Sequence, residues 1–184
     1  MLTLPGSLIE HSVQLEATVL LASDDIQDYA LTSTVRTPST FTEFVERLDA
    51  LQLWSKAESD EEIKYAILTR ATSIRKTAGC KNPEANCDLF SIGRTFRETL
   101  AAWQAGGNSK FSSTTFETCA RLVAKKPKEA CNMFGQSRAS DLAVSYRTHV
   151  TKDHEALRLM YWKLPDGSIE LACVGSKHEL EIPA

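Results

Sequence analysis

The spacing of apolar residues changes twice along this chain, and these two changes constrain the fold more than any other feature. From Ile9 to Leu21 the odd positions are mostly apolar and the even positions are mostly polar, which is the period of two of a half-buried strand. A second run, from Tyr29 to Val35, has the same alternation. We therefore expect an N-terminal β-hairpin over residues 1–38.

Residues 39–135 have instead the three- and four-residue spacing of amphipathic helices. Three helix starts have a Ser or Thr followed three residues later by Glu, which is the capping-box pattern, and an Asp begins a further helix. The predicted N-caps are Thr40, Ser59, Asp88 and Thr114. A short turn around 130–134 is expected to end at Gly135. The middle of the chain thus predicts about four helices.

Beyond Gly135 the period of two returns, and residues 136–184 predict a three-stranded antiparallel meander. Its strands contain Leu142 to Tyr146, Leu157 to Leu164 and Ile169 to Cys173, and the turn Pro165-Asp166-Gly167-Ser168 joins the last two. We expect these strands and the two N-terminal strands to meet in one antiparallel sheet, with the helices over one face or as a side layer. The predicted fold is α+β, in a single domain over 1–184.

Two observations bear on the compartment. No apolar run approaches the ~20 residues that cross a bilayer, and the first residues lack the basic start of a secretory signal. The chain has five cysteines, an odd number that favours free thiols over a disulfide framework. Cys80 and Cys87 nevertheless bracket a loop that a disulfide could close. The sequence predicts a cytoplasmic protein without membrane contact.

The charge of the chain is unevenly distributed. The formal charge is −7 over residues 1–60, +6 over residues 61–138 and −2 over residues 139–184, within a total of −3. Either these charges only complement helix ends and each other, or the ends of neighbouring helices form one positive surface that binds a polyanion. The cations of that surface are Arg70, Arg75, Lys76, Lys81, Arg94, Arg97, Arg121, Lys125, Lys126 and Lys128.

The sequence contains no motif for a metal or a cofactor. The spacings Cys80 to Cys87 and Cys119 to Cys131 do not match those of zinc sites, and no histidine lies near them in the sequence. There is no glycine-rich phosphate loop and no nucleophile elbow. We therefore expect no metal and no cofactor, and no catalytic residue follows from the motifs.

Residues 155–184 contain Arg158, Leu159, Met160 and Tyr161 on one strand, a Pro-Asp-Gly turn, and a second strand followed by Lys177 and His178. This segment resembles the central hairpin of RelE/HigB-type toxins, which cleave mRNA on the ribosome without a metal. The resemblance implies that Arg158 and Lys177 stabilise the scissile phosphate, and that His178 or Tyr161 transfers protons. The alternative interpretation is that Arg158 and Lys177 are ordinary side chains on the wet face of a sheet.

The charge distribution favours an interaction or assembly protein whose basic helical surface contacts an anionic partner, with nucleic acid as the first expectation. The first alternative is a metal-independent ribonuclease of the RelE/HigB type. The second is an adaptor or structural protein that does not bind nucleic acid. The sequence also leaves open a protein partner or a homo-oligomer.

Overall fold

The computed structural model describes residues 12–18, 30–36, 47–83, 89–153, 156–179 and 181–183. The chain forms two compact units, Met1–Arg47 and Leu48–Ala184. In the first unit, strands β1 (Ser12–Thr18) and β2 (Ala30–Arg36) pair antiparallel as a two-stranded sheet of their own. The residues that connect them lie outside the described ones. The predicted single sheet, joining strands from both ends of the chain, is therefore wrong.

The second unit contains a mixed five-stranded sheet with the order β3-β7-β6-β5-β4. Strand β3 (Phe90–Ile92) is parallel to β7 (Ile169–Gly175), and the remaining neighbours are antiparallel. Strands β4 (Asn132–Arg138), β5 (Ala143–His149) and β6 (Arg158–Lys163) complete it. The C-terminal meander thus has four strands instead of the predicted three, within an α+β fold.

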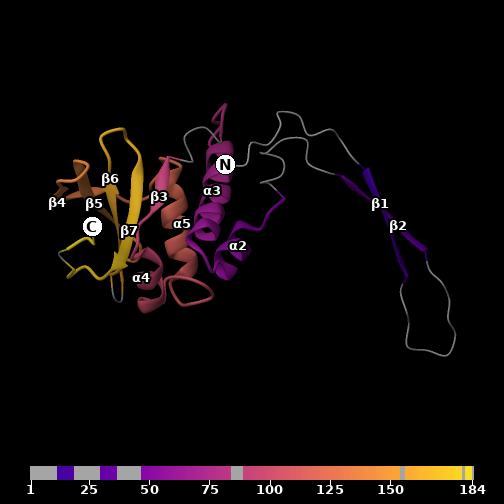
Figure 1. Cartoon of the computed structure of the whole chain (residues 1–184), viewed down its shortest axis with the longest axis horizontal. Coiled ribbons are helices and arrows are strands. Elements are labelled where there is room, and N and C mark those ends of the chain that lie inside the picture. The colour runs from indigo at the N-terminus through magenta and orange to yellow at the C-terminus, as the bar shows by residue number, and fades with distance from the viewer. Residues whose placement is uncertain are drawn as a thin grey trace. The chain divides into compact units, whose positions relative to one another are not determined.

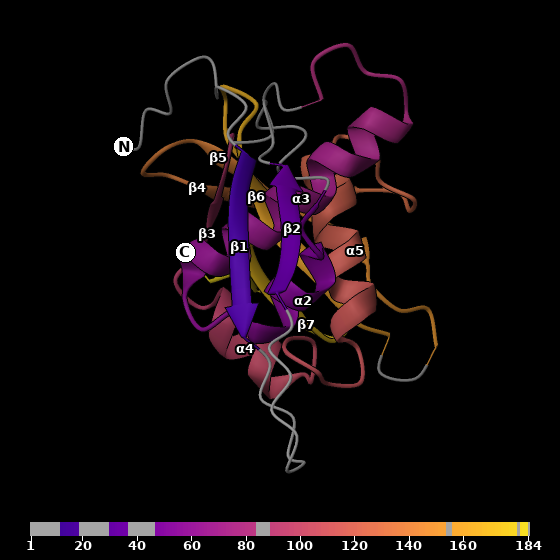
Figure 2. The same cartoon turned by 90° about the vertical axis from the view of Figure 1, so that its right-hand side faces the viewer.

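Four helices are described in this unit, and Figure 1 shows α2, α3 and α5 on one side of the sheet. Figure 2 presents α3 and α5 from the side away from the sheet. Their bounds are Ala50–Lys56 for α2, Asp60–Thr77 for α3, Phe96–Ala102 for α4 and Ser112–Val123 for α5. None of the described helices is long and apolar enough to cross a membrane.

Both faces of the central strands are buried, which explains why β6 is apolar at consecutive positions. Leu159 and Tyr161 face the helices and pack in the main core with Trp54, Phe96 and Phe116. Met160 and Trp162 face the opposite way and pack in a second cluster with Ala143, Cys173 and Ile182. The C-terminal segment covers this second cluster, since the Trp162 indole donates a 3.0 Å hydrogen bond to the Pro183 carbonyl.

The helix predicted from Asp88 is wrong where the structure describes it. Phe90–Ile92 is strand β3, and helix α4 begins only at Phe96; Asp88 itself lies outside the described residues. An apolar run this short fits a helix and a strand equally well, so periodicity could not decide. Gly93 ends the strand beside β7, where an added Cβ would lie 3.0 Å from the Leu171 carbonyl oxygen.

Two further local predictions are wrong. Gly135 does not end a turn: it lies within β4 with a φ of +85°, at a bulge in the pairing with β5. Helix α5 begins after Phe111 instead of at Thr114, so Glu117 is inside the helix and its carboxylate is free to contact other residues.

Other local predictions are confirmed. Ser59 and Glu62 form the predicted capping box at the start of α3. The turn at 165–168 joins β6 to β7, with the Gly167 amide donating to the Leu164 carbonyl at 3.0 Å. The predicted cap at Thr40 lies outside the described residues, and α2 begins instead at an N-cap formed by Asp49.

Candidate functional site

Several of the arginines in the predicted basic surface contact other groups of the protein. Arg70 of α3 and Arg121 of α5 both bind the carboxylate of Glu117, at 2.9 and 2.6 Å. Arg97 donates a hydrogen bond to the Glu58 carbonyl. Arg70 and Arg97 therefore hold neighbouring elements together in addition to carrying charge, whereas Arg121 pairs with Glu117 within α5.

The pKa of Glu117 depends on two opposing effects, which are the burial of its carboxylate and the attraction of the two arginines. Burial acts to raise the pKa, but the hydrogen bonds and charges of Arg70 and Arg121 outweigh it, so the pKa lies below its ordinary value. Glu117 is consequently ionised at neutral pH and neutralises part of the positive charge of the two guanidinium groups. The side chain of Glu117 is 25% exposed, so water still screens the contact.

The lysines at the end of α5 have no such partner. Lys125, Lys126 and Lys128 are exposed, and within the described part of the chain none of them has an ion pair or a side-chain hydrogen bond. Lys81 and Arg94 are also exposed and unpaired there. The predicted set thus contains both paired arginines and unpaired cations, and three of the unpaired ones lie together.

The local sequence explains why these lysines leave the helix together. The Lys126 amide donates to the Arg121 carbonyl at 2.8 Å and the Lys125 amide donates to the Leu122 carbonyl at 3.0 Å, which is the pattern of a Schellman motif. Lys125 takes the left-handed position of that motif, with a φ of +57°. Pro127 follows and cannot continue the helix. The chain therefore turns away, with lysines on both sides of Pro127.

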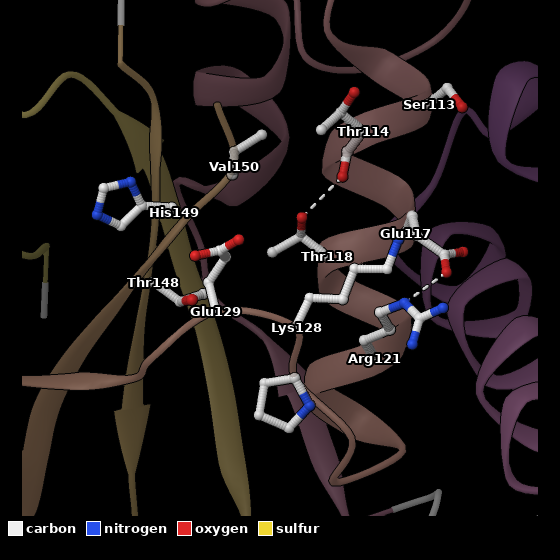
Figure 3. A pocket seen from close by; sticks show the side chains of 11 residues that line it. Ser113, Thr114, Glu117, Thr118, Arg121, Lys128, Glu129, Thr148, His149 and Val150 are labelled. Atoms are coloured by element: carbon white, nitrogen blue, oxygen red, sulfur yellow. Dashed lines mark hydrogen bonds and ion pairs between the residues drawn. The ribbon is translucent and has the colours of Figure 1, made fainter. Parts of the chain in front are cut away.

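A pocket of about 310 Å³ adjoins this turn, between α5 and β5 (Figure 3). Hydroxyl groups from Ser113, Thr114 and Thr118 line it from α5, and Lys128 and Glu129 line it from the following loop. The Thr118 hydroxyl donates to the Thr114 carbonyl at 2.8 Å. The pocket therefore offers polar groups that can hydrogen-bond a ligand.

The charges around this pocket leave an excess of two positive charges. Glu129 forms a 3.1 Å ion pair with Lys152, and Glu117 is held by its two arginines, so both carboxylates are already paired. Lys128 is then the lining cation without a partner among the described residues. The groups in this balance are Arg70, Arg121, Lys128 and Lys152 against Glu117 and Glu129.

The sequence reasoning identified Arg121 and Lys128 but missed the pocket. The signal that was available is the run Ser112-Ser113-Thr114-Thr115, followed by Thr118 one turn after Thr114. That run was interpreted as a helix cap. Whether its hydroxyls face a cavity depends on β5, which comes about 30 residues later in the chain.

A larger hollow of about 540 Å³ lies between α2 and α3 and differs in chemistry. Leu53, Ala57 and Tyr65 give it an apolar lining. The carboxylate of Glu62, which also lines it, is engaged in the capping box at the start of α3. Gln52, Lys56 and Glu61 also line the hollow, but its surface is mainly apolar, so we regard the pocket beside α5 as the better candidate for a polar ligand.

One residue of the toxin resemblance, Tyr161, lies on a different face of the sheet from Arg158. Tyr161 faces the helices, is 4% exposed and has a pKa raised by burial. Arg158 lies three positions earlier on β6, on the face of Met160 and Trp162, which is the opposite one. Lys177 and His178 are exposed in the turn after β7. The structure thus separates Tyr161 from the arginine with which the resemblance groups it.

The thiols do not form a reactive site in the described chain. Cys80, Cys119, Cys131 and Cys173 are free, whereas Cys87 lies outside the described residues. Burial raises the pKa of Cys119, and it raises the pKa of Cys173 to about 12, so neither forms a thiolate at neutral pH. Over the described residues no group of His, Cys, Asp and Glu is placed to hold a metal ion.

Comparisons with family models, with curated proteins and with solved structures found no match for this chain.

Proposed function

We propose that this chain binds an anionic partner, with nucleic acid as the favoured class, through the lysine surface formed by Lys125, Lys126 and Lys128. The observation that carries the proposal is that these three side chains are exposed, close in sequence and without a carboxylate partner in the part of the chain that the structure describes. Unpaired lysines of this kind attract phosphate groups, because binding releases condensed counterions from the nucleic acid.

The chemistry around the lysine surface favours contact with the phosphate backbone over reading of bases. Base recognition in single strands needs exposed aromatic rings for stacking. Phe116 of α5 and Trp54 of α2 are 4% and 2% exposed, and their tilted rings pack against each other in the core. We therefore expect binding that depends on salt and little on sequence.

The pocket beside α5 extends the same surface. Lys128 belongs to both, and the excess of positive charge around the pocket continues that of the lysines. Its hydroxyl groups suit the oxygens of a phosphate or a sugar. The proposal places the protein in the cytoplasm, where nucleic acid is accessible and where a free thiol such as that of Cys80 stays reduced.

Fluorescence anisotropy with a labelled single-stranded RNA tests the proposal. We expect Lys126→Glu/Lys128→Glu to weaken RNA binding by roughly tenfold to a hundredfold, because two attractive contacts become repulsive. The matched control is Lys56→Glu/Lys163→Glu, which changes the net charge equally at exposed positions on α2 and β6. Equal loss in both double variants would show that only the net charge matters and would overturn the proposed surface.

The same titration distinguishes the other functions that the sequence predicts. Shortening of the RNA during incubation would favour the ribonuclease of the RelE/HigB type, with Arg158→Ala as the variant that should then abolish cleavage. No binding at low salt would favour the adaptor. Denaturing gel electrophoresis of the titrated RNA separates intact binding from cleavage.

A further inference from the structure

Three basic side chains lie on the same face of β5 and β6, away from the helices. Arg147 and His149 are two positions apart on β5, and Arg158 of β6 is paired with His149. Their neighbour in this register, Met160, belongs to the cluster on the far side of the sheet from the helices. Figure 3 shows the His149 ring on the side of β5 away from α5. Side chains opposite each other in such a pair have Cβ atoms about 5 Å apart.

Arg158 is held in place by backbone carbonyls and not by a carboxylate. Its Nη1 donates hydrogen bonds to the carbonyl of Ala156 at 2.6 Å, of Leu157 at 3.1 Å and of Thr151 at 3.3 Å. The Nε and Nη2 atoms have no hydrogen-bond partner among the described residues. One edge of the guanidinium is therefore fixed, and its remaining donors are free for a ligand.

Arg147 is fixed by an aromatic ring. Its guanidinium carbon lies 4.5 Å from the centre of the Phe134 ring, and it has no ion pair within the described chain. Burial lowers the pKa of Arg158, and the charge of Arg147 lowers it further. The two guanidinium groups thus repel each other, and neither forms an ion pair within the described chain. The nearby carboxylate is that of Glu179, which lies beside Gly175, the residue paired with Arg158.

The third member of the cluster is His149, whose neutral imidazole ring lies among positively charged side chains. Its Nδ1 is enclosed and has no hydrogen-bond partner among the described residues. Burial lowers the pKa of His149, and the charges of Arg158, Lys152 and Arg147 act in the same direction. Glu129 is the carboxylate that opposes them, and it is already paired with Lys152.

We propose that Arg147, His149 and Arg158 form a receptor for the doubly charged phosphate of a phosphomonoester. Two guanidinium groups without an anion supply the charge and the planar donors that phosphate oxygens prefer. A bound dianion favours the protonated form of the His149 ring, and the protonated ring can then donate a third hydrogen bond to the phosphate. The receptor lies on the face of β5 away from α5, although His149 also lines the edge of the pocket beside that helix.

The NMR signal of the His149 ring tests the receptor, with inorganic phosphate as the probe at constant ionic strength. His149→Gln assigns the signal among the four histidines. We expect saturating phosphate to raise the pKa of His149 by roughly half a unit or more, because the dianion stabilises the charged ring. Arg147→Gln should weaken phosphate binding by about tenfold, since it removes a charged hydrogen bond. The control Lys56→Gln removes an exposed cation on α2 and should leave binding unchanged.

Two RNA oligonucleotides that differ only in a 5′-phosphate or a 5′-hydroxyl identify the source of the ligand. A larger shift with the phosphorylated end assigns the receptor to nucleic-acid termini, whereas a shift with inorganic phosphate but with neither oligonucleotide assigns it to small phosphomonoesters. Equal shifts with both oligonucleotides would show binding of the phosphodiester backbone and would overturn the proposal. The proposal is also overturned if phosphate leaves the His149 signal unchanged, or if Arg147→Gln binds phosphate as tightly as the wild type does. The spectrum of each variant also reports whether it is folded.

Discussion

The middle of α5 and its C-terminal end use positive charge in different ways. In the middle, Arg121 and the neighbouring Arg70 converge on one carboxylate, that of Glu117. At the end, Lys126 and Lys128 extend into solvent, and the described chain provides no carboxylate for them. Cations on neighbouring parts of the fold can thus differ in role: Arg70 joins α3 to Glu117 of α5, Arg121 pairs with Glu117 within the helix, and the unpaired lysines are available to a partner.

Replacing Glu117 should have the largest effect on stability, because it removes the carboxylate that the two paired arginines share. Glu117→Ala leaves Arg70 and Arg121 without their shared partner, and we expect the free energy of unfolding to fall by about 2 kcal/mol, because charged hydrogen bonds are lost from a half-buried site. Urea denaturation measures it. Glu61→Ala on α3, an exposed position, is the matched control and should stay within about 0.5 kcal/mol of the wild type.

The same variant should also alter binding in the opposite sense. With Glu117 gone, the two arginines add uncompensated charge beside the lysine surface, so RNA binding should tighten modestly while stability falls. If Glu117→Ala weakens RNA binding without unfolding the protein, the middle of α5 belongs to the binding surface. The proposed difference in role between the middle and the end of α5 is then wrong.

The pH dependence of stability tests whether the Glu117 carboxylate is ion-paired in the folded protein. The pKa of Glu117 is lowered in the folded protein, so its contribution to stability is present above the ordinary value of 4.5 and is lost as the pH falls through the lowered pKa. We expect the difference in unfolding free energy between the wild type and Glu117→Gln to shrink steadily below pH 4.5. A difference that stays constant down to roughly pH 3 would contradict the ion pair.

Local features of the fold were predictable from the sequence, and non-local ones were not. The capping box at Ser59 and the turn at Asp166 and Gly167 depend on residues within four positions of each other. Strand β3 was predicted as helix, because its pairing with β7 lies almost 80 residues away. The separate sheet of β1 and β2 follows from tertiary contacts that alternation alone does not report.

For the candidate site, too, the residues were predictable from the sequence, but their tertiary contacts were not. The sequence identified every lysine of the proposed surface by counting charge, but it could not tell Arg121 from Lys128. That distinction requires the position of Glu117, which the sequence assigned to a helix cap, and the position of Arg70, which reaches Glu117 from 47 residues away. Arg147 and His149 lie beyond the strand predicted over Leu142 to Tyr146, and only the pairing of β5 with β6 brings Arg158 beside them.

The salt dependence of RNA binding measures how many phosphate contacts the lysine surface makes. Each lysine that contacts a phosphate of single-stranded RNA contributes about 0.7 to the slope of the logarithm of the binding constant against the logarithm of the salt concentration. We predict that Lys126→Gln/Lys128→Gln reduces the steepness of this slope by about 1.4, whereas Arg70→Gln leaves it unchanged. An unchanged slope in the double lysine variant would show that Lys126 and Lys128 do not contact phosphate groups of the RNA.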